Sequence, residues 1–290
     1  MIGARDVVVL PDLAYRHDPA SAHRKALAVV EKLPVFSPVV SRLVASLGDD
    51  SVSFAEIASL IERDTVLAGQ LLRLVNSAVY SRGREISSVR RAVSILGIAK
   101  LRNFAVSFLV AKMWTRVKVA ASFSAARFNL HGVATAIMAD LLAQKVPVPY
   151  GEGAFSAGLL HDVGKLLVAA ALPNEYELLI QSQEWDPAQE TQRLGVSHGE
   201  LSREILDRWR LPQPICDAAA RHHAPGDGAL SLAHLVCAAN QFTNALGISI
   251  QPREADPGAK PFEALGFGAD ESADLSQRFD VEFEAVRQFL

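Results

Sequence analysis

Apolar residues recur three or four positions apart along most of the chain, which is the spacing of one face of an α-helix. The pattern begins at Ser21 and is interrupted by Pro34 and Pro38. Further stretches of this kind cover residues 39–47, 54–61, 67–75, 89–96 and 100–113. Short helices joined by turns of a few residues are typical of a compact bundle. We therefore expect an all-α fold that begins with a helical bundle over residues 21–125.

The helical period continues in the second half, which we place at residues 126–250. Segment 251–290 is expected to be a polar linker followed by a terminal helix that packs back on the bundle or on a second copy of the chain. Residues 1–20 are expected to form an arm, either extended or a single edge strand. The helices expected in the second half cover residues 131–142, 155–167, 175–183, 198–209, 214–223 and 230–246.

Local signals mark several of the expected helix ends. The segments beginning at Ser53 and at Ser197 each have serine followed three residues later by glutamate, which is the pattern of a capping box. Gly97 follows an apolar stretch, where a helix often ends in left-handed conformation. Pro173 is expected to close one helix, and Pro214 suits the first turn of another.

Composition indicates a folded chain without a strong charge. Half of the 290 residues are hydrophobic, 21% are charged, and the net charge is −3. The pI near 6.2 argues against general nucleic-acid binding. A local basic cluster is better explained as a solvated helix face than as a patch that binds DNA or phosphate. Its members are Arg82, Arg84, Arg90, Arg91, Lys100 and Arg102.

The chain shows no features that direct it to a membrane or out of the cell. No stretch approaches the run of about 20 apolar residues that a membrane helix requires, and the first residues lack the pattern of a secretion signal. We therefore expect a cytoplasmic protein without membrane contact. Cys216 and Cys237 lie in apolar helical surroundings and are expected to be reduced core residues.

Histidines provide the strongest chemical signal. Six of the eight lie between residues 131 and 234, and His161 directly precedes Asp162 in an apolar segment. Imidazole and carboxylate together commonly bind a divalent cation, although a single buried histidine more often donates to a backbone carbonyl. A buried Asp162 requires compensation, either by a cation or by a salt bridge with Lys165. The pattern predicts a shared metal pocket.

Two further positions are less clear from spacing alone. His198 lies in the first turn of an expected helix, where a ligand and a surface residue are equally plausible. His222 and His223 are adjacent at an expected helix end and would point about 100° apart. We therefore expect that at most one of this pair readily faces the pocket of His161.

Several short motifs together resemble the HDOD family, the signalling branch of the HD metal-dependent phosphohydrolase superfamily. The resemblance covers roughly residues 25–250. The motifs are Leu33-Pro34, Ile61-Glu62-Arg63-Asp64, Leu74-Val75-Asn76-Ser77, Ala92-Val93-Ser94-Ile95-Leu96-Gly97, Gly158-Leu159-Leu160-His161-Asp162-Val163-Gly164-Lys165, Ser197-His198-Gly199-Glu200 and Arg221-His222-His223.

The resemblance implies a helical bundle packed on an HD-like helical half that holds the site. By position, His131 would be the first metal ligand of the superfamily and His161 with Asp162 the central pair. His198 with His222 or His223 would form the supplementary set. Where the superfamily has a late aspartate, this chain has Asn240, a neutral ligand that weakens the match to a cation. Lys165 would lie near the scissile phosphate in an active relative.

The resemblance favours a non-catalytic regulatory or scaffold module of signal transduction over an enzyme. The alternative is a metal-dependent phosphohydrolase acting on a nucleotide or cyclic dinucleotide, with Lys165 as its catalytic residue. A divalent metal of unknown identity is expected in the pocket, unless the lost carboxylate prevents its binding. The expected partners are a signalling protein, a small nucleotide or anion at Lys165, and a second copy of the chain.

Overall fold

The computed structural model describes residues 19–30, 54–77, 80, 85–114, 117–181, 186–251, 255–256 and 258–287. Regular structure in these ranges consists of helices alone, so the expected all-α fold is confirmed. The expected arm, apart from Pro19 and Ala20, lies outside the described residues, as does Ser53 of the first predicted capping box.

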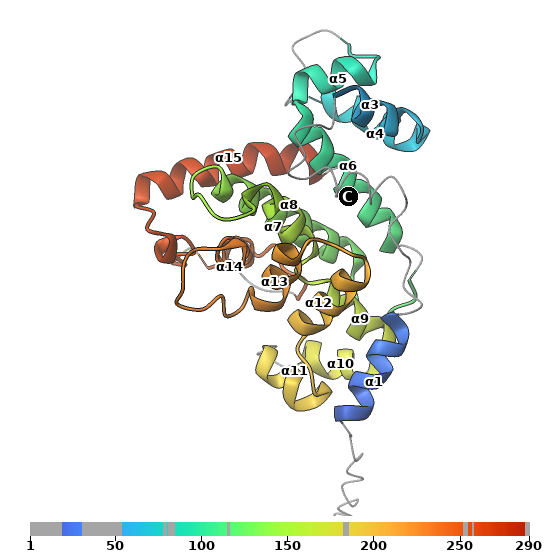
Figure 1. Ribbon diagram of the computed structural model, residues 1–290, viewed down its shortest axis with the longest axis vertical. Helices are drawn as coiled ribbons and strands as arrows, with labels where there is room; N and C mark the ends of the chain where they lie inside the picture. The colour runs from blue at the N-terminus through green and yellow to red at the C-terminus, as the bar shows by residue number, and fades with distance from the viewer. Residues whose placement is uncertain are drawn as a thin grey trace, which may run out of the picture.

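An N-terminal group of helices occupies one end of the molecule (Figure 1). It contains α3 (Phe54–Glu62), α4 (Thr65–Val75) and α5 (Val89–Leu96), and α6 (Ile98–Trp114) connects it to the rest. Gly97 has φ of +77° between α5 and α6, which is the predicted left-handed helix end.

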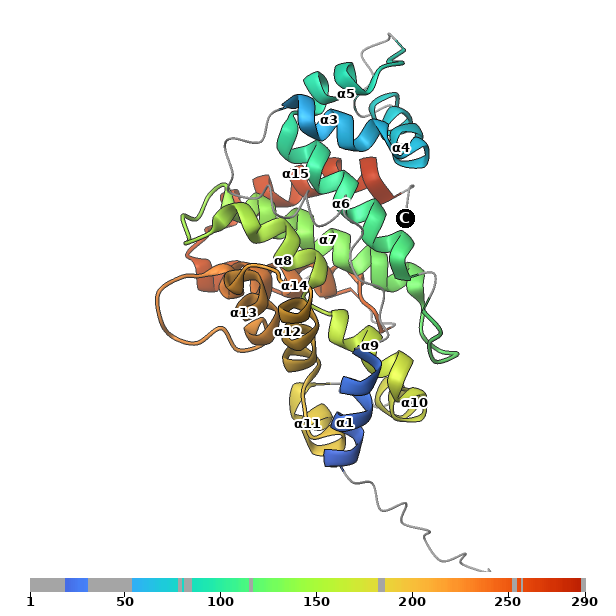
Figure 2. The same cartoon turned by 45° about the vertical axis from the view of Figure 1, so that its right-hand side comes forward.

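The second half forms a larger helical body below this group (Figures 1 and 2). Helix α7 packs against α8 and α14, and α12 packs against α9 and α13. The bounds of the elements are α7 (Ala125–Ala143), η1 (Gly151–Gly153), α8 (Ala154–Leu160), α9 (Val163–Ala171), α10 (Pro173–Gln181), α11 (Pro187–Leu194), α12 (His198–Arg208), α13 (Gln213–Arg221), α14 (Leu232–Ala245), η2 (Glu263–Leu265) and α15 (Ala269–Arg287).

Helix α1 (Pro19–Val30) packs on this second half rather than beside α3–α5, unlike the bundle expected from the sequence. Its buried Ala22, Ala26 and Val30 face α9 and α11. Figures 1 and 2 both place α1 at the far end of the molecule from α5. Helix α1 is close to α3–α5 in the sequence, but it packs on and stabilises the second half, which carries most of the histidines.

The terminal helix α15 packs back on α7 of the same chain. Leu275, Phe279 and Phe283 of α15 are buried, and the Phe279 ring meets that of Phe242 on α14 edge to face. The boundaries of α10 and α11 differ from expectation. Helix α9 ends at Ala171, just before Pro173 as predicted, and Pro173 also begins α10. Helix α11 was not predicted because it has few apolar positions.

One apolar segment corrects the expectation about membrane spans. By length and hydropathy Gly151–Ala171 is sufficient to cross a membrane, but 83% of its window is buried inside the protein. The segment is also divided by the turn between α8 and α9. Its apolar character is therefore explained by packing in the protein core.

A candidate metal centre at the turn between α8 and α9

His161 and Asp162 occupy the turn between α8 and α9 and are both buried. Glycines on either side let this turn approach its neighbours closely. A Cβ atom at Gly158 would lie 2.8 Å from the Cα atom of Ala136 on α7, and one at Gly164 would overlap the carbonyl oxygen of His198. The two glycines of the motif therefore allow contact with α7 and α12, the helices that carry His131 and His198.

Four imidazole rings surround the carboxylate of Asp162. Each of its two oxygens lies close to two of these rings. Asp162 Oδ2 lies 3.5 Å from Nε2 of His131 and 3.3 Å from Nε2 of His161. Asp162 Oδ1 lies 3.1 Å from Nε2 of His198 and 3.6 Å from Nε2 of His222. Helices α7, α12 and α13 thus place three rings around the turn that carries the fourth.

The opposite nitrogen of three of these rings is held by the main chain. Nδ1 of His131 donates to the carbonyl of Ile248 at 2.8 Å. Nδ1 of His161 and of His222 donates to the carbonyl three residues earlier, at 2.7 and 2.8 Å. A neutral imidazole that donates through Nδ1 keeps a lone pair on Nε2. The three rings are therefore oriented with a metal-binding atom toward Asp162.

His198 is held by a buried carboxylate that was not predicted. Glu190 on α11 is fully buried and accepts from the backbone N–H of His198 at 2.6 Å and from its Nδ1 at 2.7 Å. Burial acts to raise the pKa of Glu190, but His198 outweighs it, so the pKa is lowered and the group is ionised. No sequence pattern pointed to Glu190, because the helix that positions it was itself not predicted.

His222 and His223 both join the cluster, so the expectation that only one could do so is wrong. His222 follows the last residue of α13, and His223 lies in the turn beyond it. The angular spacing of a helix therefore does not separate their rings. Nε2 of His223 lies 3.1 Å from Nε2 of His198, and the His223 side chain is at the exposed rim of the centre.

Lys165 forms the salt bridge that was one of the two interpretations of Asp162. Its Nζ donates to Asp162 Oδ2 at 2.9 Å. Burial acts to raise the pKa of Asp162, but His161 and Lys165 outweigh it and hold the pKa well below its usual range. Asp162 is therefore an ionised carboxylate in a buried site. Its role as a metal ligand stays a prediction.

The residues fit a divalent cation. Nε2 of His161 and Oδ1 of Asp162 are buried without a hydrogen-bond partner among the described residues, a costly arrangement unless a further group satisfies them. Burial lowers the pKa of His131 and of His222, which keeps these rings neutral and able to bind a cation. Two overlapping sets share Asp162, one with His131 and His161, the other with His198, His222 and His223.

Asn240 lies on α14 and is buried, but the side-chain contact found for it among the described residues is with Asn244. Its Oδ1 accepts from Nδ2 of Asn244 at 2.8 Å. Asn240 and His223 line the same open cavity. The structure thus places Asn240 next to the rim of the centre, and its role as a ligand stays a prediction.

Two of the six members of the basic cluster, Lys100 and Arg102, have acidic neighbours within the protein. Lys100 forms an ion pair with Glu282 on α15 at 2.7 Å, and Arg102 is a charged neighbour of Asp140. Arg90 and Arg91 are exposed on α5, while Arg82 and Arg84 lie outside the described residues. Nucleic-acid binding by this cluster gains no support from these positions.

Comparison with known proteins agrees with the geometry. The sequence model of the HDOD domain matches residues 33–225. An uncharacterised protein of Treponema pallidum (strain Nichols) is 23% identical over 212 residues, which are 67% of this chain and 38% of that protein. This chain therefore spans less than half of the length of that relative.

Solved structures share the fold. An HDOD domain protein of unknown function from Geobacter sulfurreducens has a TM-score of 0.76 at 23% identity, covering 94% of this chain and 99% of that one. A protein named for signal transduction from Marinobacter aquaeolei VT8 has a TM-score of 0.72 at 20% identity, covering 96% and 68%. A protein named as a phosphohydrolase from Shewanella amazonensis SB2B has a TM-score of 0.62 at 20% identity, covering 91% and 92%.

Proposed function

Because this chain belongs to the HDOD domain family, we propose that it is a metal-binding regulatory module of signal transduction rather than an enzyme. The observation that carries the metal-binding part is the convergence of His131, His161, His198 and His222 on Asp162. His223 adds a fifth imidazole at the rim. These residues would hold one divalent cation, or two that share the carboxylate.

The absence of catalysis is proposed from the charges of the centre. Asp162 is the single carboxylate among the proposed ligands, and Lys165 already pairs with it. Asn240 adds no charge at the position where the family resemblance leads us to expect a carboxylate. A divalent cation bound by neutral imidazoles and one carboxylate has less of its charge neutralised than a cation bound by two carboxylates. The ligands and the groups that support them determine the chemistry of such a site.

A phosphohydrolase is the second candidate, and a specific observation favours it. The two oxygens of Asp162 face different pairs of imidazoles, which is an arrangement able to bridge two cations. Paired cations can stabilise the attacking and leaving oxygens of a phosphoryl transfer. In this case Lys165 would bind a phosphate oxygen, and the substrate class would be a nucleotide or cyclic dinucleotide.

Metal titration of the purified chain tests the site. After treatment with EDTA, calorimetry with Mn²⁺ and Zn²⁺ should detect saturable binding that Asp162→Ala abolishes. His23→Ala is the matched control, since His23 contacts Glu204 and lies outside the centre. Equal binding by the Asp162→Ala variant would reject the metal site.

A phosphodiesterase assay separates the two candidates. With either metal, bis-p-nitrophenyl phosphate and a cyclic dinucleotide should not be hydrolysed above the level of the Asp162→Ala variant. Hydrolysis by the wild-type chain that this variant lacks would establish the phosphohydrolase instead. A gain of hydrolysis in Asn240→Asp would identify position 240 as the reason why the wild-type chain is inactive.

The proposed module also requires a partner. We infer a signalling protein as the partner, a small anion near Lys165, and self-association as a further property to measure. Cytoplasmic location is part of the same proposal. Light scattering of the purified chain would give its oligomeric state, and co-purification from cells with and without Asp162→Ala would identify a partner that depends on the centre.

A further inference from the structure

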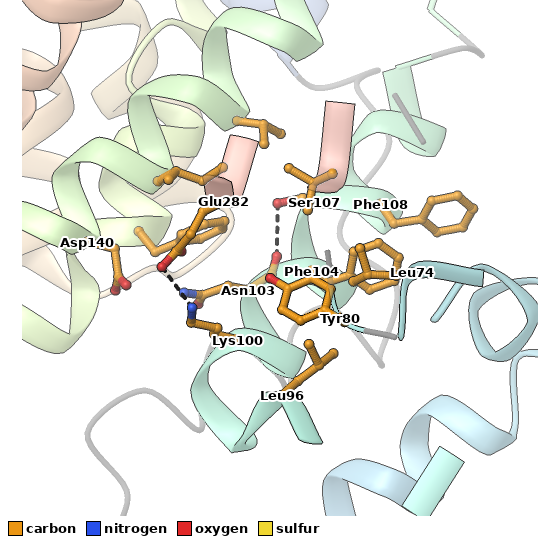
Figure 3. A pocket seen from close by; sticks show the side chains of 14 residues that line it. Leu74, Tyr80, Leu96, Lys100, Asn103, Phe104, Ser107, Phe108, Asp140 and Glu282 are labelled. Atoms are coloured by element: carbon orange, nitrogen blue, oxygen red, sulfur yellow. Dashed lines mark hydrogen bonds and ion pairs between the residues drawn. The ribbon is translucent and has the colours of Figure 1, made fainter. Parts of the chain in front are cut away.

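A second cavity lies where the N-terminal helices meet the rest of the molecule, and we call it the junction cavity. It is bounded by α4, α5, α6, α7, α8 and α15 (Figure 3). None of the proposed metal ligands lines it. Apolar side chains form most of its wall, namely Leu74, Leu96, Phe104, Phe108, Val133, Ile137, Phe155 and Val286.

The size of the junction cavity limits its occupant to a small molecule. The volume within it that the centre of a water molecule can reach is about 50 Å³. Since one water needs roughly 10–15 Å³ of such space, the cavity holds roughly three to five waters. That space corresponds to a single five- or six-membered ring. Phe104 and Phe108 contribute a stacked pair of rings to the wall, which suits a flat and largely apolar occupant.

The charged groups of the junction cavity already have partners within the protein. Lys100 Nζ lies 2.7 Å from Glu282 Oε1. Asp140 Oδ2 accepts from the side chain of Gln144 at 3.1 Å, while burial and the charge of Glu282 raise the pKa of Asp140 despite Gln144 and Arg102. A charged occupant would therefore enter without a free counter-charge, which is costly in a largely buried site. These contacts favour a neutral occupant.

Asn103 presents a carboxamide to the junction cavity. Asn103 is 9% exposed, and the hydrogen bond found for it among the described residues is the one that its backbone carbonyl accepts from Ser107 Oγ. Figure 3 shows the side chain in the cavity next to the Lys100–Glu282 pair. A carboxamide presents a donor and an acceptor side by side, so it pairs with a partner whose edge carries the complementary acceptor and donor.

From these four features we propose that the junction cavity binds a neutral one-ring molecule with a cyclic amide edge, such as a pyridone or a pyrimidine base. The ring lies against the aromatic wall, and its amide edge pairs with the Asn103 carboxamide. The molecule thereby contacts α6 of the N-terminal group and Val133 and Ile137 of α7. It joins the two parts of the protein.

Binding of 2-pyridone to the full chain tests the proposal. Titration followed by NMR should give saturable binding, with toluene bound more weakly, and benzoate and benzylamine not bound. Asn103→Leu keeps the volume but removes the amide. It should weaken 2-pyridone binding about tenfold, the effect of losing a pair of hydrogen bonds, and leave toluene within about twofold. Leu96→Phe, which fills the cavity, should abolish binding of both molecules.

Controls separate recognition from loss of fold. Gln213→Leu removes an exposed carboxamide that bonds Asp207 and should leave 2-pyridone binding unchanged. Helical circular dichroism and the melting temperature of each variant report folding. The proposal is overturned if 2-pyridone does not bind, if Asn103→Leu binds it as tightly as the wild type, or if benzoate or benzylamine binds equally well. All of these measurements are independent of metal at the other site.

Discussion

Glu190 accepts two hydrogen bonds from His198, one from its backbone N–H at 2.6 Å and one from its ring Nδ1 at 2.7 Å. The opposite ring nitrogen of His198 lies 3.1 Å from Asp162 Oδ1. One buried carboxylate therefore fixes both the position and the tautomer of a histidine that faces another carboxylate. Groups that orient a ligand in this way commonly change metal affinity 10- to 100-fold when they are altered.

Replacing Glu190 should thus weaken metal binding without removing a ligand. We expect Glu190→Gln to lower the affinity for Mn²⁺ or Zn²⁺ about 10-fold or more, because the amide supports the His198 ring less well than the carboxylate. Calorimetry measures the change. Glu204→Gln is the control, since Glu204 meets His23 at 3.4 Å and lies outside the centre. Equal affinities of the two variants would show that Glu190 has no positioning role.

Lys165 competes with a cation for Asp162. Lys165→Met should raise metal affinity about 3- to 10-fold, since it removes a positive charge 2.9 Å from the carboxylate. The same change should weaken binding of inorganic phosphate to the metal-loaded chain. Lys145→Met controls for net charge, because Lys145 pairs with Asp274 on the surface. Weaker metal binding by Lys165→Met would contradict this prediction.

The stability of the metal-free chain should fall as the pH is lowered from about 7.5 to 5.5. The pKa values of His131, His222 and His223 are lowered by burial, so the unfolded chain takes up protons near pH 6.5 that the folded chain does not bind. The pKa of His198 is raised, because Glu190 outweighs its burial, and this group opposes the trend. With three of these rings lowered and one raised, the net effect approaches about two protons at the lower end of this range, or about 2–3 kcal/mol per pH unit.

Urea denaturation across this pH range measures the effect. His222→Gln should reduce the slope of stability against pH, because it removes a group that resists protonation in the folded state. His198→Gln should make the slope steeper, because it removes the group that opposes the trend. Slopes that change in the same direction for both variants would be inconsistent with the assigned shifts.

Gly164, which lies against the backbone of α12, should tolerate a side chain far less well than a glycine with free space at its Cβ position. Gly164→Ala places a Cβ atom against the carbonyl oxygen of His198 and should cost about 3 kcal/mol or more of unfolding free energy. Gly69→Ala is the matched control, since Gly69 lies within α4 with nothing near its Cβ position. It should stabilise the chain by about 0.5–1 kcal/mol. Similar urea midpoints for the two variants would contradict the packing argument.

Part of this structure was predictable from local patterns. The helical period gave the all-α fold, and Ser197 with Glu200 forms the predicted capping box at the start of α12. The sequence also indicated that His161 and Asp162 belong together in an apolar segment. These features depend on neighbours within a few residues, which is the range over which periodicity and capping act.

Other features depend on contacts between distant segments. Glu190 belongs to a short polar helix, and its burial follows from packing that no period reveals. The position of α1 against α9 and α11 likewise requires the complete fold. His223 was misjudged because the geometry of an ideal helix was extended past the residue where α13 ends.

The close approach of main-chain segments at Gly164 and Gly199 affects how the sequence can change during evolution. Gly164 meets a carbonyl oxygen of His198, and Gly199 lies against main-chain atoms of Ala219 and Ala220 beside His222. The helices that carry the imidazoles are thus spaced by backbone against backbone. Most surrounding side chains can be exchanged without moving these helices, so a lineage can alter its surfaces and specificity extensively while it inherits the same central architecture.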